Sequence, residues 1–328
     1  MNNNVVIIGG GGFIGSYVAE HYAKNNFNVT VIDNFLTGRQ ENLVNLINLD
    51  NFKLIAKDFL EIDKNEINLL ISKAKYVYNF AAIVGIEHVL KNPLKTLDVN
   101  TRILNEVLEI AANLTDKPII LTASTSEVYG SQDGALSEKE SPALIEDTLK
   151  YHSSYPISKL MNENVASIYY QEKKVPIIIL RLFNTIGPRQ IGKYGMVVPR
   201  FIKAAMGNSP IMVHGDGTQT RSFCDVRDTA KILFDLAKQK DALGKIFNVG
   251  NDQTISIMDL ALLVKELCNS KSDIITIPFE DYYGDQLKNY VNIIHREPNL
   301  EKLKNIISVK YSWDLSDTIK NMAGISQQ

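Results

Sequence analysis

The sequence predicts an open, doubly wound α/β sheet with a smaller α/β lobe at its C-terminal end. Short apolar, β-branched runs recur through the first half of the chain, and segments of helical periodicity separate them. The runs are apolar on both faces, which is typical of parallel strands covered by helices on each side. The alternation βαβα therefore favours a parallel sheet. The expected strands cover residues 5–8, 29–32, 52–56, 76–80, 119–122 and 177–180.

The texture of the chain changes after residue 180. Glycine and proline recur there, and only isolated strand candidates follow. We therefore place a first domain at residues 1–180 and a second lobe at 181–328. Residues 247–249 have the pattern of a strand that could belong to either part. Parts of 222–250 are therefore expected to join the first domain.

The amino-acid composition limits the kinds of binding partner that the protein is expected to have. The 328 residues include 35 Lys and Arg against 37 Asp and Glu, a formal net charge of −2. Without a basic surplus, nucleic acid and anionic membranes are not expected partners, and a small molecule is. The two cysteines, Cys224 and Cys268, have no neighbours at metal-ligand spacing, so neither a disulfide scaffold nor a metal site is predicted. No signal peptide or apolar run of about 18 residues is visible, which predicts a cytoplasmic protein.

The first strand runs directly into a glycine-rich turn. Gly9, Gly12 and Gly15 stand between the strand at 5–8 and a helical pattern. A dinucleotide site needs glycine at a tight turn, glycine where the backbone approaches a pyrophosphate, and glycine where helix packs on strand. The N-terminus of the helix then receives the anionic charge. The turn predicts a dinucleotide cofactor.

An acidic residue ends the second expected strand. The Asp33 carboxylate can accept hydrogen bonds from both ribose hydroxyls of an adenosine and would repel a 2′-phosphate. This favours NAD over NADP. Arg39, six residues later, is the one feature that argues for NADP, and we rank it below Asp33.

A cluster of hydroxyl side chains follows the fifth expected strand. It includes Thr125 and Ser126 and is followed by Glu127, at the sheet edge where α/β proteins bind ligands. Tyr155 and Lys159 are four residues apart and would share a helix face. A nearby ammonium stabilises a phenolate, so this spacing predicts a Tyr155 with a lowered pKa that can take a proton from a hydroxyl group.

One feature of this second motif is unusual. Pro156 directly follows Tyr155 and biases it away from helical geometry, yet proline fits the first turn of a helix. The helix is therefore expected to begin near this point.

With these motifs in order, the chain resembles the extended short-chain dehydrogenase/reductases, and among them the NAD-dependent nucleotide-sugar epimerases, dehydratases and decarboxylases. The resemblance implies a Rossmann-type NAD-binding domain at 1–180 and a nucleotide-sugar-binding lobe at 181–328. Matching positions implied to contact NAD are Gly9, Gly12, Phe13, Ile14, Gly15, Asp33, Asn34, Gly38, Asp58, Phe59, Ala81, Ala82, Asn100, Tyr155 and Lys159. Positions implied to bind the nucleotide sugar are Asn184, Arg189, Val198, Phe201, Arg221 and Arg296.

The resemblance also implies a chemistry. Tyr155 would remove the proton of the sugar 4-hydroxyl while C4 is oxidised, Lys159 would hold the nicotinamide ribose, and Thr125 would hydrogen-bond the same oxygen. The implied substrate is a nucleotide-diphosphate sugar, a UDP-sugar foremost. The family further implies a homodimer, for which residues 96–113 and 155–172 are the candidate helices.

Three reactions remain open once C4 is a ketone. Return of hydride to the other face of the ketone gives a 4-epimer. Loss of water gives a 4-keto-6-deoxy sugar. A sugar with a C6 carboxylate can instead lose that carboxylate as carbon dioxide. The motif Thr125-Ser126-Glu127 resembles that of the UDP-glucuronate decarboxylases. In those enzymes the glutamate and a downstream arginine, here Arg296, assist the decarboxylation. The stretch 188–196 is more similar to UDP-hexose 4-epimerases, so 4-epimerisation is our leading expectation, with decarboxylation or dehydration as the alternative. A non-catalytic NAD-binding regulator would be expected to lose Tyr155 or Lys159, and both are present.

Overall fold

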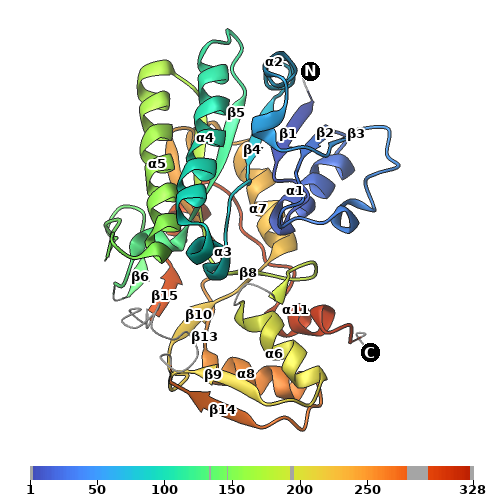
Figure 1. Ribbon diagram of the computed structural model, residues 1–328, viewed down its shortest axis with the longest axis vertical. Helices are drawn as coiled ribbons and strands as arrows, with labels where there is room; N and C mark the ends of the chain where they lie inside the picture. Colours follow the sequence, from blue (N-terminus) through green and yellow to red (C-terminus); the bar gives the residue numbers. More distant parts are fainter. Residues whose placement is uncertain (1–2, 133, 146, 193–195, 279–294, 326–328) are drawn as a thin grey trace.

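A computed structural model describes residues 3–132, 134–145, 147–192, 196–278 and 295–325 (Figure 1). Its centre is a seven-stranded sheet in the order β12-β7-β5-β4-β1-β2-β3, in which every neighbouring pair is parallel. The strands are β1 (Asn4–Ile8), β2 (Asn28–Ile32), β3 (Phe52–Ile55), β4 (Tyr76–Asn79), β5 (Ile119–Thr125), β7 (Ile177–Leu182) and β12 (Lys245–Val249). The predicted doubly wound α/β fold is confirmed, and each of the six expected strands falls on one of these.

Helices cover both faces of this sheet. On one face α1 (Phe13–Lys24) and α7 (Val226–Ala237) pack on Val5 and Ile7, and on the other α2 (Lys64–Ser72), α4 (Pro93–Ala112) and α5 (Ser154–Lys173) pack on Val6 and Ile8. Alternate residues of one strand thus enter different cores, which explains why the strands are apolar throughout. Figure 1 shows α4 and α5 side by side on one flank.

The second lobe forms its own core. It contains α6 (Val197–Met206) and α8 (Ile257–Leu267), which pack on the parallel pair β9 (Ile211–His214) and β14 (Ile274–Ile277). A four-stranded sheet lies between the lobes in the order β13 (Thr254–Ser256), β10 (Thr220–Ser222), β15 (His295–Pro298), β6 (Ala135–Leu136). Leu300, Leu303 and Ile307 pack with the α1 face of the large sheet. The division near residue 180 stays a prediction.

Short elements complete the chain. They are α3 (Ile86–Lys91), α10 (Glu301–Lys304), α11 (Leu315–Met322), the strand pair β8 (Thr185–Ile186) and β11 (Cys224–Asp225), and the 3-10 helices η1 (Gln40–Leu43), η2 (Phe59–Glu61), η3 (Ser126–Tyr129), η4 (Tyr151–Ser153) and η6 (Lys240–Ala242). Across the described ranges, no helix has both the length and the apolarity that crossing a membrane requires.

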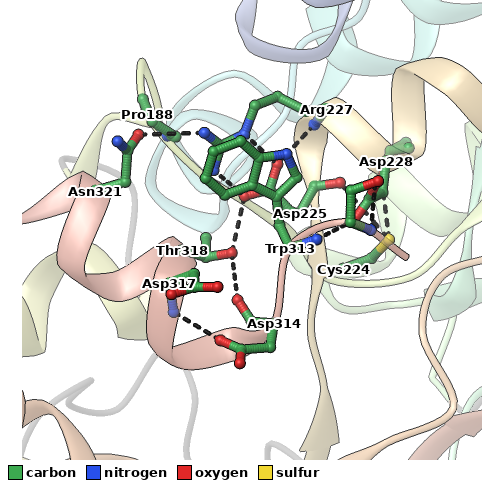
Figure 2. Close-up of polar contacts among 12 residues, drawn as sticks. Pro188, Cys224, Asp225, Arg227, Asp228, Trp313, Asp314, Asp317, Thr318 and Asn321 are labelled. Carbon is green, nitrogen blue, oxygen red and sulfur yellow. Dashed lines mark hydrogen bonds and ion pairs between the residues drawn. The ribbon is translucent and has the colours of Figure 1, made fainter. Parts of the chain in front are cut away.

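The C-terminal segment is fastened to the start of α7 (Figure 2). The Arg227 guanidinium forms a bidentate pair with Asp225, with N···O distances of 2.8 and 2.6 Å, and its carbon lies 3.2 Å from the centre of the Trp313 ring. Thr318 of α11 donates to Asp225 at 2.8 Å, and the Asp228 carboxylate accepts the backbone N–H groups of 312 and 313. Asp225 lies in β11, which pairs with β8. These contacts of Asp225 therefore support a strand pair beside the candidate site.

Candidate functional site

A cavity of about 580 Å³ opens at the carboxyl ends of the parallel strands, between the large sheet and the second lobe. Ligands of open α/β sheets bind at this edge, in clefts of this size. The glycine turn lies at one end of the cavity, the ends of β4 and β5 line its middle, and residues of α6, β9 and β10 close the other end.

The glycine turn is built to admit a ligand. Gly9 has φ +83°, and a side-chain carbon there would lie 2.6 Å from the Ala81 nitrogen. A carbon on Gly15 would overlap the Gly9 carbonyl, whereas one on Gly12 would meet only that oxygen at 3.2 Å and otherwise open space. The helix α1 begins just after Gly12 without a side-chain cap, so its first N–H groups stay available to an anion. Gly12, Phe13, Ile14 and Gly15 line the cavity.

Asp33 stands at the end of β2 beside this turn. Its Oδ2 accepts from the Gly11 nitrogen at 2.8 Å and its Oδ1 from the Phe35 nitrogen at 2.7 Å. Burial raises the pKa of the Asp33 carboxyl, and these backbone bonds oppose the rise. Each oxygen keeps a further lone pair for a ribose hydroxyl. Gly38 packs on Gly11 and Asp33 instead of lining the cavity, and Arg39 is exposed outside it.

A second polar pair lies next to Asp33. Asn34 donates to the Asp58 carboxylate at 2.8 Å, and Asp58 also accepts from the Leu60 nitrogen. Both residues line the cavity with Phe59, Ala81 and Ala82, as expected. Lys57 and Phe80 line it too and were missed, although both follow strand ends where such residues gather.

Asn100 lies in α4 outside the cavity wall. Its Oδ1 accepts from the Ile83 nitrogen at 2.7 Å, and its Nδ2 donates to Ser158 at 3.1 Å. It therefore holds the loop after β4 against α5. In the structure Asn100 supports the loop that lines the cavity, and its contact with the cofactor stays a prediction.

Tyr155 and Lys159 lie in the first turns of α5. Pro156 occupies the third position of this helix, where proline is tolerated, so the expected helix start is confirmed. The Lys159 Nζ donates to the Ala123 carbonyl of β5 at 2.9 Å and lies 5.9 Å from the centre of the Tyr155 ring. Thr125, at the end of β5, accepts from the Glu127 nitrogen at 3.2 Å. The side chains of Thr125, Glu127, Tyr155 and Lys159 line the cavity.

The electrostatics of this group differ from the prediction. Burial raises the pKa of Tyr155 well above its ordinary value, the Glu127 charge raises it further, and a hydrogen bond with Thr125 lowers it. Burial also lowers the pKa of Lys159 to about 8. The predicted lowering of the Tyr155 pKa by Lys159 is wrong for this structure, because the ammonium is directed to the Ala123 carbonyl and desolvation dominates.

Glu127 and Arg296 line the same cavity, and the Arg296 charge is near enough to act on the Glu127 carboxyl. Glu127 belongs to η3, and Arg296 comes from β15, where only 9% of its surface is exposed. Burial raises the pKa of the Glu127 carboxyl, and the Arg296 charge opposes that rise. Ser126 is buried and lines the wall beside them. The structure thus brings together two residues that the resemblance paired.

The other implied sugar-nucleotide residues divide into two groups. Asn184, Val198 and Arg221 line the cavity. Phe201 does not: it is buried in the core of the second lobe. Arg189 reaches the wall, but its guanidinium is bound to α1 through Ser16 at 3.0 Å, an ion pair with Glu20 and the ring of Tyr17.

Three polar residues of the second lobe were missed. Arg200, His214 and Gln219 line the cavity, and burial together with the Arg200 charge lowers the pKa of His214 to about 4. His214 and Gln219 flank Gly215 and Gly217, two of the glycines that recur after residue 180. That adjacency was the available signal.

Comparison with known proteins places this site. Residues 5–250 match the family model described as the NAD dependent epimerase/dehydratase family. The chain belongs to this family. It is therefore an enzyme of the NAD-dependent epimerase/dehydratase family with NAD as cofactor, and the open N-terminus of α1, the bare face of Gly12 and the Asp33 carboxylate fit that cofactor.

Individual relatives extend along the whole chain. The UDP-N-acetyl-alpha-D-glucosaminuronate decarboxylase of Bacillus cytotoxicus is 34% identical and covers 98% of both chains. UDP-glucuronic acid decarboxylase 1 of Arabidopsis thaliana is 31% identical over 97% of this chain and 68% of its own length. The structure of UDP-glucuronic acid 4-epimerase from Bacillus cereus in complex with NAD superposes with a TM-score of 0.84 at 25% identity, over 98% of both chains.

Proposed function

We propose that this enzyme decarboxylates a UDP-linked hexuronate after transient oxidation of the sugar at C4. The observation that carries the proposal is that Glu127 and Arg296 line one cavity with Tyr155 and Lys159, where the Arg296 charge acts on the Glu127 carboxyl. Two relatives that match 97% or more of this chain and are named as decarboxylases of UDP-linked uronates support it. The expectation of 4-epimerisation therefore gives way to its alternative.

The glycine turn and Asp33 would hold NAD, which would supply a reversible hydride acceptor for sugar C4, so that no net oxidation would occur over a turnover. Tyr155 is the proposed base that takes the proton of the 4-hydroxyl and gives it back at the end of the turnover; the positive charge of a bound oxidised nicotinamide would oppose the rise in its pKa that burial causes. Thr125 hydrogen-bonds the phenol and holds its oxygen in place. Lys159 is held between β5 and α5 by its bond to the Ala123 carbonyl, and burial lowers its pKa to about 8.

The 4-ketone makes the C6 carboxylate a β-keto acid. The C5–C6 bond breaks, its electron pair moves toward the C4 oxygen, carbon dioxide leaves, and C5 takes up one proton. Arg296 suits the carboxylate because its planar fork binds two oxygens at once. Glu127 is the proposed donor of the proton for C5, and the burial that raises its pKa favours the protonated form that this role needs.

The second lobe is the proposed nucleotide site. Arg221 of β10 lines the cavity and suits a diphosphate, and His214 and Gln219 offer polar atoms farther from the sheet. Arg189 remains a proposed contact through its place in the wall, with its guanidinium held by α1.

Epimerisation at C4 is the second candidate. It is favoured by the likeness to the UDP-glucuronic acid 4-epimerase structure and uses the same Tyr155 and Lys159 chemistry without breaking a carbon bond. Arg296 would then hold a uronate that keeps its carboxylate.

Product analysis separates the candidates. The purified protein is incubated with NAD and, in separate reactions, UDP-glucuronate, UDP-N-acetylglucosaminuronate, UDP-glucose and UDP-N-acetylglucosamine, and the products are examined by mass spectrometry and chromatography. We expect a product lighter by carbon dioxide from at least one uronate and no conversion of the neutral sugars. A product of unchanged mass with a new retention time would replace decarboxylation by epimerisation.

A further inference from the structure

We propose that Tyr129 is a positioning residue for the decarboxylation step, because its hydroxyl joins the segment that carries Glu127 to the strand that carries Arg296. The inference rests on the proposed function and adds to it a residue outside the cavity wall. Tyr129 is fully buried and contacts neither end of the cavity.

On one side, Tyr129 fixes η3. It is the last residue of this short helix, two positions after Glu127. The Arg181 guanidinium lies over its ring with a separation of 4.5 Å, and Arg181 is held by a buried bidentate pair with Glu163 at 2.9 and 2.7 Å. Ser124 of β5 donates to the same Glu163 at 2.5 Å. The ring of Tyr129 is therefore anchored to the sheet.

On the other side, the Tyr129 hydroxyl donates to Asn248 at 2.8 Å. The Asn248 amide donates in turn to the carbonyls of Leu136 at 2.8 Å and Asn299 at 3.2 Å. Leu136 pairs with Pro298 in the β6–β15 ladder, and Asn299 donates back to Leu136 at 2.7 Å. Asn248 thus holds the end of β15, two residues after Arg296.

The two catalytic segments are consequently joined beneath the cavity by a continuous set of buried hydrogen bonds. Tyr155 and Lys159 are not members of this set, although they share α5 with Glu163; the set reaches Glu163 through Arg181, whose contact with the Tyr129 ring does not need the bond to Asn248. Loss of the Tyr129 hydroxyl should therefore displace Glu127 relative to Arg296 and leave the C4 oxidation site in place. Displacements of about 1 Å between reacting groups slow reactions by roughly 100-fold.

The test is Tyr129→Phe, which removes one oxygen atom and keeps the ring. Tyr78→Phe is the matched control, since Tyr78 is also fully buried and its hydroxyl is bonded to Tyr22 at 2.8 Å, on the α1 face of the sheet. In a single turnover of a UDP-hexuronate, C4 oxidation is followed by the near-ultraviolet absorbance of the reduced nicotinamide, and carbon dioxide release is measured separately. Melting temperatures of both variants show that they are folded.

We expect Tyr129→Phe to oxidise C4 within about twofold of the wild-type rate and to release carbon dioxide roughly 10- to 100-fold more slowly, so that the 4-keto uronate accumulates. Tyr78→Phe should leave both rates unchanged. Equal effects of Tyr129→Phe on both rates, or none on either, would overturn the inference. Should Tyr129→Phe not fold, Asn248→Ser carries the same expectation. A wild type that releases no carbon dioxide would overturn the proposed function itself, and this inference with it.

Discussion

Replacement of Lys159 by methionine should stabilise the cofactor-free protein at neutral pH while it abolishes turnover. Only 3% of the Lys159 surface is exposed, and burial lowers its pKa from the ordinary 10.5 to about 8. Such a drop corresponds to about 3 kcal/mol of unfavourable free energy while the lysine is charged. Methionine removes this cost and also the bond to the Ala123 carbonyl, which is worth about 1 kcal/mol. We therefore expect a net gain of about 2 kcal/mol at pH 7.

The sign of the pH dependence follows from the same shift. The pKa of Lys159 is lower in the folded than in the unfolded protein, so the unfolded chain binds the extra proton between pH 8 and 10.5. Wild-type stability should rise with pH across this window relative to the variant. The advantage of Lys159→Met should be full below pH 8 and disappear by about pH 10.

Urea unfolding at pH 7 and pH 9.5 measures the effect, with circular dichroism and the emission of Trp313, the single tryptophan, as probes. Lys24→Met is the control, because its side chain is 75% exposed, and we expect no pH-dependent difference from wild type. A Lys159→Met protein less stable than wild type at pH 7, or a difference equal at both pH values, would refute the reasoning.

Three further predictions follow from the site and the helices. Gly9→Ala should destabilise the fold by about 2 kcal/mol or more, because φ is +83° and the added carbon meets the backbone. Gly12→Ala should fold normally but lose the rise in melting temperature that addition of NAD causes in the wild type. Normal NAD binding by Gly12→Ala would contradict the placement of the pyrophosphate. Ile168→Glu, at a position of α5 that is 44% exposed, should convert the predicted homodimer to a monomer in light scattering, and an unchanged mass would remove α5 from the interface. Tyr155→Phe should abolish turnover and keep NAD binding, and residual turnover near the wild-type rate would exclude its role as the base.

Much of the large sheet could be predicted because its signals are local. Each expected strand is a short apolar run, and the glycine turn, Asp33 and the Tyr155–Lys159 spacing each lie within a few residues of a strand or helix end. The ends of parallel strands meet at one edge, so the sequence order alone brought the glycine turn, Thr125 and Tyr155 to a common cavity.

The remaining features depend on contacts between distant segments. The resemblance implies a nucleotide-sugar contact for Arg189, but it does not reveal that the guanidinium is bound to Ser16 and Glu20 of the first helix. Val198 and Phe201 lie close together in α6, but Val198 lines the cavity, whereas Phe201 is buried in the core of the second lobe. The pKa of Tyr155 was predicted from one neighbour, whereas burial, which no spacing reveals, sets its direction. The Tyr129–Asn248 bond likewise joins residues that are far apart in the chain.

The most direct test of the proposed reaction follows the C6 carbon itself. UDP-glucuronate and UDP-N-acetylglucosaminuronate labelled with carbon-13 at C6 are each incubated with the protein and NAD, and the label is observed by nuclear magnetic resonance during the reaction. The account predicts that from at least one uronate the label leaves the sugar as carbon dioxide and bicarbonate at the rate at which a UDP-pentose appears. Retention of the label in a carboxylate with both uronates, while a new C4 configuration forms, would contradict it and establish epimerisation instead.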